Sequence, residues 1–87
     1  MVAIDEPFPW STNGTTWWAH LFADTPEELH AAARMLGLRR AWFQYQRHPH
    51  YDLKGGVLRR AQAMYPTVTG RAKIAMLARC REAMRGG

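Results

Sequence analysis

The chain has 87 residues, the length of one domain, and its 47% hydrophobic content excludes a disordered chain. The single cysteine, Cys80, excludes an internal disulfide and a cysteine-based zinc framework, which suits a reducing compartment. No apolar run approaches the roughly 20 residues that a membrane helix needs, and residues 1–6 lack the basic start and apolar centre of a signal peptide. The sequence therefore predicts a soluble cytoplasmic protein with no membrane partner.

The net charge of +5 is unevenly distributed along the chain. Residues 1–33 hold five acidic residues and no Lys or Arg, whereas residues 34–87 hold all twelve Lys and Arg beside Asp52 and Glu82. A strongly basic segment predicts affinity for nucleic acid, for a phosphate-bearing ligand, or for an acidic or nucleic-acid-handling protein. The alternative is a solvated helical surface whose charges only keep the protein soluble.

The first half of the chain predicts two strands and a helix. Residues 2–4 form a short apolar run that ends at Asp5, as a buried strand does. A loop with the turn dipeptide Asn13-Gly14 follows, and we expect its Phe8 and Trp10 to cover the core as a lid. Residues 15–23 predict a second strand, and period-two alternation places the following three side chains on one face: Trp18, His20 and Phe22.

The segment from Asp24 to Gly37 carries the clearest helix signals in the chain. Asp24 or Thr25 can cap the first free N–H groups, and Pro26 suits the first turn. Gly37 can adopt the left-handed conformation that ends a helix. Apolar residues recur at helical spacing and predict a face that packs on the core: Leu29, Ala32, Ala33 and Leu36.

The second half predicts a third strand over residues 40–45, a helix over 57–65 ended by Pro66, a very short strand at 67–68, and a last helix over 69–84. The sequence therefore predicts a single α/β domain over residues 1–87, with a short sheet of three to four strands and about three helices packed on it. The short link from the first helix to the third strand resembles a βαβ unit, so we expect parallel neighbouring strands. Ligand sites in such sheets lie beyond the carboxyl ends of the strands.

A polar segment follows the predicted third strand and holds two of the four histidines, His48 and His50, together with Asp52. If strand ends meet at one edge, these side chains join Asp5 and His20. Imidazoles titrate near neutral pH and a carboxylate can orient one of them, so this set predicts acid–base chemistry on a phosphate ester. The candidate catalytic residues are His20, His50, Asp52 and Asp5. The alternative is a buried polar network that only fixes the loop.

The spacing His48-Pro49-His50 also predicts a metal site. Alternate side chains of an extended segment point the same way, so His48 and His50 can bind Zn²⁺, with Asp5, Asp52 or His20 completing the shell. The alternative is that His50 and Asp52 bond to backbone groups and leave His48 in water.

Several basic, polar and aromatic side chains near this segment are candidates for ligand binding. The aromatic residues of the third strand can stack on bases or fill the core. The candidate binding residues are Arg39, Arg40, Gln44, Arg47, Tyr51, Arg59 and Arg60.

A string of motifs resembles one family. These are the opening 2–5 (VAID), the Trp10 loop, 18–30 (WAHLFADTPEELH), 36–44 (LGLRRAWFQ) and 50–52 (HYD). Over its first 53 residues the chain resembles a family of small bacterial, often phage-encoded domains of unknown function, number four thousand and thirty-one. The resemblance implies no activity, but it implies a common polar site that holds the following residues: Asp5, His20, Asp24, His30, Gln44, His50 and Asp52.

The chain departs from that family after Asp52. Similar proteins begin the next helix with Ser or Thr, Lys and Arg, whereas this chain has 55–58 (GGVL) there. Two functions stay open at this point. The first is a binding module for nucleic acid, a phosphate-bearing ligand or a nucleic-acid-handling protein. The alternative is a metal-assisted or acid–base phosphoesterase that resembles a nuclease.

Overall fold

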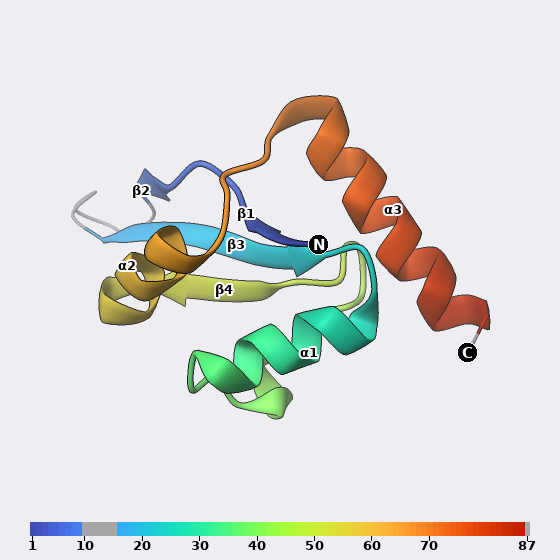
Figure 1. Ribbon diagram of the computed structural model, residues 1–87, viewed down its shortest axis with the longest axis horizontal. Coiled ribbons are helices and arrows are strands. Elements are labelled where there is room, and N and C mark those ends of the chain that lie inside the picture. The colour runs from blue at the N-terminus through green and yellow to red at the C-terminus, as the bar shows by residue number, and fades with distance from the viewer. Residues whose placement is uncertain (10–15, 87) are drawn as a thin grey trace.

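The computed structural model describes residues 1–9 and 16–86, and it shows an α/β domain with a four-stranded antiparallel sheet (Figure 1). The predicted lid residue Trp10 and the predicted turn Asn13-Gly14 lie outside the described residues. The elements, in chain order, are β1 (Val2–Ile4), β2 (Phe8–Pro9), β3 (Trp17–Ala23), α1 (Pro26–Met35), the 3-10 helix η1 (Arg40–Trp42), β4 (Tyr51–Lys54), α2 (Gly55–Met64) and α3 (Gly70–Gly86).

The long strand β3 is the centre of the sheet. It pairs with β1 and β2 and also with β4, and all three pairings are antiparallel. Isolated bridges join Ile4 to Thr67 and Gln44 to His50. The expectation of parallel neighbouring strands is therefore wrong for the four strands of the sheet, although the single bridge between Ile4 and Thr67 is parallel. The physical reason is the bend after Gln44, which reverses the chain and sends β4 back along β3 in the opposite direction.

The two faces of the sheet carry different side chains. Ala19, Leu21 and Ala23 of β3 pack with α1 and α2 in the larger core, to which Tyr51 and Leu53 of β4 also belong. Phe22 points to the other face, where it packs with Ala3 of β1 and with Met76 and Leu77 of α3. Helices α1 and α3 thus lie on opposite sides of the sheet (Figure 1). The predicted alternation along β3 is confirmed.

The predicted first helix is also confirmed, and its ends have the predicted chemistry. The Thr25 hydroxyl accepts a hydrogen bond from the backbone N–H of Glu28 at 3.2 Å, and Pro26 begins the helix. Gly37 has a φ of 80°, the left-handed region that favours glycine after a helix.

The predicted third strand over residues 40–45 is wrong. Residues 40–42 form η1 instead, and only Gln44 makes a strand-like bridge. Aromatic residues favour strands only where a sheet can cover them, and here Trp42 and Tyr45 are exposed. The actual strand, β4, lies in the segment that the sequence indicated as a polar loop. The predicted strand at 67–68 is a single bridge at Thr67, and the last two helices start within two residues of the predicted positions.

Among the described residues, no helix has both the length and the apolar character needed to cross a membrane.

Candidate functional site

A polar cluster lies on the face of the sheet that α3 covers only in part. In the register of β3 and β4, His20 is opposite Asp52 and Trp18 is opposite Lys54. Helix α3 covers the Phe22 end of this face. The remaining part opens into a cavity of about 370 Å³ with the following lining residues: Phe8, Trp18, His20, Gln44, His50 and Asp52.

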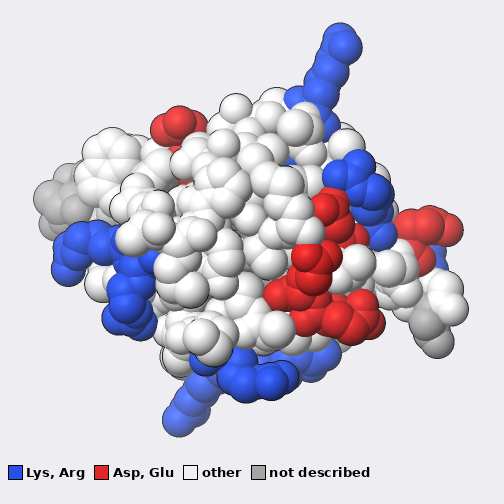
Figure 2. All heavy atoms as spheres, in the orientation of Figure 1, with Lys and Arg blue, Asp and Glu red and all other residues white. Residues whose placement is uncertain are grey.

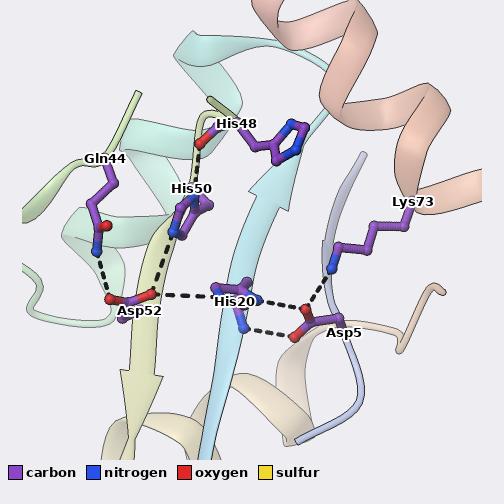
Figure 3. A network of polar contacts seen from close by, with 7 residues as sticks. All are labelled: Asp5, His20, Gln44, His48, His50, Asp52 and Lys73. Atoms are coloured by element: carbon purple, nitrogen blue, oxygen red, sulfur yellow. Dashed lines mark hydrogen bonds and ion pairs between the residues drawn. The ribbon is translucent and has the colours of Figure 1, made fainter. Parts of the chain in front are cut away.

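Asp5 fixes the position of His20 from the neighbouring strand (Figure 3). Its Oδ2 lies 2.6 Å from Nδ1 of the His20 ring, and its Oδ1 accepts the backbone N–H of His20 at 2.7 Å. The Lys73 ammonium of α3 donates to the same Oδ2 at 2.8 Å. Burial alone would raise the pKa of Asp5, but the hydrogen bonds from His20 and Lys73 outweigh it and lower the pKa to about 2. The ionised carboxylate can only accept, so Nδ1 of His20 carries a proton, and the remaining ring nitrogen, Nε2, is the one that can offer a lone pair.

His50 is oriented in the same way by a backbone carbonyl. Its Nδ1 lies 2.7 Å from the carbonyl oxygen of His48, which can only accept, so Nδ1 is protonated. Burial, opposed by this hydrogen bond, lowers the pKa of His50 below its ordinary value. The ring is therefore neutral at pH 7, with the lone pair on Nε2.

Asp52 lies between the two imidazoles. Its Oδ1 is 3.7 Å from Nε2 of His20 and 3.4 Å from Nε2 of His50. Its other oxygen, Oδ2, accepts a hydrogen bond of 2.5 Å from the Gln44 side chain. Three possible ligand atoms thus face one another, and each of the three side chains is oriented by a second group: Asp5, the His48 carbonyl and Gln44.

Two of the three spacings among these ligand atoms are close to those in a metal site. One ligand atom each from His20, His50 and Asp52 lie within 4.8 Å of one another. Ligands about 2.1 Å from a tetrahedral Zn²⁺ lie about 3.4 Å apart, which is near the two distances to Asp52 Oδ1. Two imidazoles and one carboxylate also form the ligand set of catalytic zinc and non-haem iron sites that keep open positions.

The four predicted catalytic residues lie in one connected group, but not for the predicted reason. They meet because antiparallel register places Asp52 opposite His20, and because Asp5 directly follows β1. Their roles in catalysis stay predictions.

Of the two predicted metal ligands, only His50 belongs to the cluster. His48 contributes its backbone carbonyl, while its exposed side chain points away from Asp52 (Figure 3). The prediction assumed an extended segment, but residues 46–48 form a bend. The His48 side chain lines the small hollow beside Lys73 and not the cavity at Asp52.

The predicted binding arginines do not gather around the cluster. Arg40 donates to His30, Arg60 donates to the carbonyl of Leu36 after α1, and the carbonyl of Arg47 accepts from Arg81. Arg39 lies over the ring of Trp42, and Arg59 is exposed on α2. On the face that Figure 2 shows, Lys and Arg side chains lie apart at the margins, and the acidic side chains are the ones that gather.

Three further residues named in the sequence analysis lie apart from the cluster. Tyr51, predicted to bind ligand, is 1% exposed in the larger core, and its hydroxyl lies 2.8 Å from Nδ1 of His30. This pair is on the α1 side of the sheet, so His30 does not join the common site that the resemblance implies. Asp24 is also apart from it, because its carboxylate pairs with Arg79 of α3. Gln44 does join the cluster.

Lys73, Phe8 and Trp18 are parts of the site that were not among the predicted site residues. Lys73 is 68 residues from Asp5 along the chain, and nothing in its local sequence distinguishes it from the other cations of α3. Trp18 had a visible signal, because the alternation that placed it beside His20 also places it in the cavity.

The fold and the site define a small α/β domain with two histidines and one aspartate facing an open cavity. The chain belongs to the family described as protein of unknown function (DUF4031), whose model matches residues 2–80. The match confirms the resemblance and extends it through α2 into α3. Comparisons with curated proteins and with solved structures found no match.

Proposed function

We propose that this protein is a cytoplasmic, metal-assisted hydrolase of phosphate esters, with a divalent transition metal ion, Zn²⁺ first, held by His20, His50 and Asp52. The observation that carries the proposal is the convergence of two imidazole nitrogens on one carboxylate oxygen. When both Nε2 atoms are unprotonated, three acceptors face one another, and a metal ion between them would offset their repulsion.

The surrounding groups support a metal ion more than a hydrogen-bonded network that only fixes the loop. Metal-ligating histidines generally donate their other ring N–H to a carboxylate or a backbone carbonyl. His20 donates to Asp5, and His50 donates to the carbonyl of His48. Gln44 holds one oxygen of Asp52 and leaves the other facing the imidazoles.

The open cavity supports catalysis rather than a purely structural ion. Three protein ligands leave at least one position for water or substrate, as in catalytic zinc sites. A metal ion bound there would lower the pKa of a bound water and polarise a phosphoryl oxygen. In the hydrolysis, the water oxygen bonds to phosphorus, the P–O ester bond breaks, and the proton lost by water ends on the alcohol that leaves.

The charges near the cluster favour an anionic substrate. Lys73 lines a small hollow of about 70 Å³ beside His20, His48 and His50. Lys54, on the other side, lies on the same face as Asp52. A phosphate ester would thus approach the ligands between two ammonium groups, which favours its binding over that of a neutral ester.

A direct test compares two histidines that are two residues apart. The chain, without a polyhistidine tag, is stripped with a chelator and titrated with Zn²⁺ and with Mn²⁺ by calorimetry. We expect one ion per chain for the wild type and for His48→Ala, which keeps the carbonyl that orients His50. We expect His50→Ala to weaken binding by at least about 100-fold.

Hydrolysis of bis(4-nitrophenyl) phosphate then tests the reaction. Activity should require the added metal, persist in His48→Ala and disappear in His50→Ala. Absence of metal binding by the wild type, or equal affinities of the two variants, would exclude the metal site. Metal binding with no hydrolysis of any phosphate ester would support the metal site and exclude the hydrolase activity.

Binding without catalysis is the second candidate, and one observation favours it. The net charge of +5 belongs to a chain whose Lys and Arg side chains are mostly exposed. A module that binds nucleic acid, a phosphate-bearing ligand or an acidic nucleic-acid-handling protein would show affinity that falls steeply with salt. Such affinity, unchanged in His50→Ala and without any metal requirement, would favour this function over the hydrolase.

A further inference from the structure

An aromatic groove continues directly from the cavity at the cluster. It has a volume of about 640 Å³ and follows β4 to η1. Trp18, Gln44 and Asp52 line both hollows, so a ligand in the groove would extend to the metal-ligating carboxylate. We call this hollow the tryptophan groove, with these lining residues: Trp18, Leu38, Ala41, Trp42, Phe43, Gln44, Asp52, Lys54 and Val57.

We propose that the tryptophan groove binds single-stranded nucleic acid, with a base against the Trp42 indole and the adjoining phosphodiester at the His20, His50 and Asp52 cluster. The inference rests on the proposed function, because it names the substrate class of that same site. It assigns a role to Trp42 of η1, which belongs neither to the core clusters nor to the metal ligands.

The first argument is the exposure of one aromatic side chain in the groove, Trp42. Trp42 is 53% exposed at the end of a three-residue helix. A large apolar side chain in this position contributes little to folding, but its open ring face can stack on a base. Stacking on indole tolerates any base, because every base has a π face.

The second argument is the placement of cations over the same rings. The Lys54 ammonium lies 4.9 Å from the centre of the Trp18 ring, and the Arg39 guanidinium lies 5.8 Å from that of Trp42. Each indole of the groove therefore has a positive charge beside it. This pairing matches a nucleotide, whose flat base and charged phosphate lie next to each other.

The third argument concerns the strandedness of the ligand. A base in a duplex is stacked on its neighbours and cannot lie against an indole without leaving the helix. The groove also follows the edge of a sheet, with no long basic helix that could enter a major groove. The geometry therefore favours an unpaired strand over a duplex.

The chain offers a matched control for Trp42. Trp17 is 54% exposed, but it belongs to a separate hollow lined by Glu6 and Arg59 among others. Loss of either indole removes a similar exposed ring, and only one of them lies in the tryptophan groove.

The experiment measures fluorescence anisotropy of a labelled octamer of deoxythymidine with the full chain, at several salt concentrations. We expect Trp42→Ala to weaken binding by about 5- to 100-fold and Trp17→Ala to leave it within about twofold. Lys54→Gln should reduce the slope of log affinity against log salt concentration by about 1, the value expected for the loss of one phosphate contact. Far-UV circular dichroism checks that each variant is folded.

Two competitors separate the bases from the phosphates. An abasic octamer has the same charge but no bases. In a duplex, the bases of the octamer are paired and stacked. Both should compete much more weakly than the single strand. Equal competition by the abasic strand, a preference for duplex, or equal losses in the two tryptophan variants would overturn the inference.

Failure here is distinguishable from failure of the proposed function. Binding of Zn²⁺ lost in His50→Ala, together with no octamer binding, would keep the metal site and exclude this substrate. Octamer binding that depends on Trp42, in a chain that binds no metal, would keep the groove and exclude the hydrolase.

Discussion

The two faces of the central sheet are covered by different means. Under α1 and α2, the strands present a row of buried apolar side chains that form most of the core. On the other face, Phe22 alone among the β3 side chains is fully buried, and His20 lies beside it at the open cavity. Adjacent residues of one strand therefore have different roles, as β4 shows. Leu53 is buried in the core, and its neighbour Asp52 faces two imidazoles.

The contacts of α3 show the same difference. It packs on Phe22 through Met76 and Leu77, and three of its cations also reach other elements. Lys73 binds Asp5, Arg79 binds Asp24, and Arg81 donates to the carbonyl of Arg47. One face thus provides most of the apolar stabilisation, and the other holds polar groups whose spacing is set by the sheet.

The largest expected effect comes from a core residue of β4, which we compare with its neighbour in the polar cluster. Leu53→Ala leaves a cavity in the larger core and should lower the free energy of unfolding by about 2–5 kcal/mol. Asp52→Ala removes a partly exposed carboxylate and should cost less than about 1 kcal/mol. Urea denaturation followed by circular dichroism measures both, with a chelator present so that no metal ion contributes.

Equal losses in these two variants would contradict the comparison, because the polar cluster would then stabilise the fold as much as the core does. Zn²⁺ should raise the stability of the wild type and not that of Asp52→Ala, since ligand binding stabilises the folded state only. This result would show that the polar face binds an ion while the apolar face holds the fold together.

The sequence predicted the two faces of β3 because side-chain alternation is a local property. Trp18, His20 and Phe22 share a face whatever the strand pairs with. The ends of α1 were also predicted, since Thr25 and Gly37 act within one turn. The segment after Gly37 was not predicted, because its aromatic residues favour a strand and the fold exposes them on η1 instead.

The sequence predicted several residues of the cluster, but not the arrangement that brings them together. Pairing of His20 with Asp52 depends on register, which is set by the whole sheet. Lys73 reaches Asp5 from the far end of the chain, so no local pattern could identify it. His48 seemed equivalent to His50, but beyond the bend before Pro49 only His50 lines the cavity at Asp52.

The next largest effect is expected at Asp5, the most buried charge on the partly covered face. Asp5→Ala removes the acceptor of the His20 backbone, the His20 ring and the Lys73 ammonium. Hydrogen bonds to charged groups contribute about 1.5–3 kcal/mol, and donors left without a partner add to the loss. We expect a decrease of about 2–3 kcal/mol in the free energy of unfolding. The adjacent exposed residue provides the control, and Glu6→Ala should stay within about 0.5 kcal/mol of the wild type. Similarly small effects of Asp5→Ala and Glu6→Ala would mean that water takes the place of the Asp5 carboxylate in its hydrogen bonds at little cost.

The smallest effect concerns the ion pair that joins α3 to the end of β3. Burial alone would raise the pKa of Asp24, but hydrogen bonds from Arg79 and from the amino group of Met1 lower it. A lowered carboxyl pKa stabilises the fold above the pKa of the unfolded chain, and this contribution is lost as the pH falls through the lowered folded value. Arg79→Gln should therefore cost about 0.5–1 kcal/mol at pH 7 and low salt, and progressively less below about pH 4.

The same helix contains the control for this pair. Arg85 lies 3.8 Å from Glu82, and both side chains are more than two-thirds exposed. Arg85→Gln should change the free energy of unfolding by less than Arg79→Gln at every pH, because solvent screens a pair that no other element confines. Urea denaturation of the three proteins from pH 3 to pH 7 measures the difference. If the two variants coincide throughout, then the apolar contacts of Met76 and Leu77 hold α3 without help from Asp24, and the two faces of the sheet are closed in the same way.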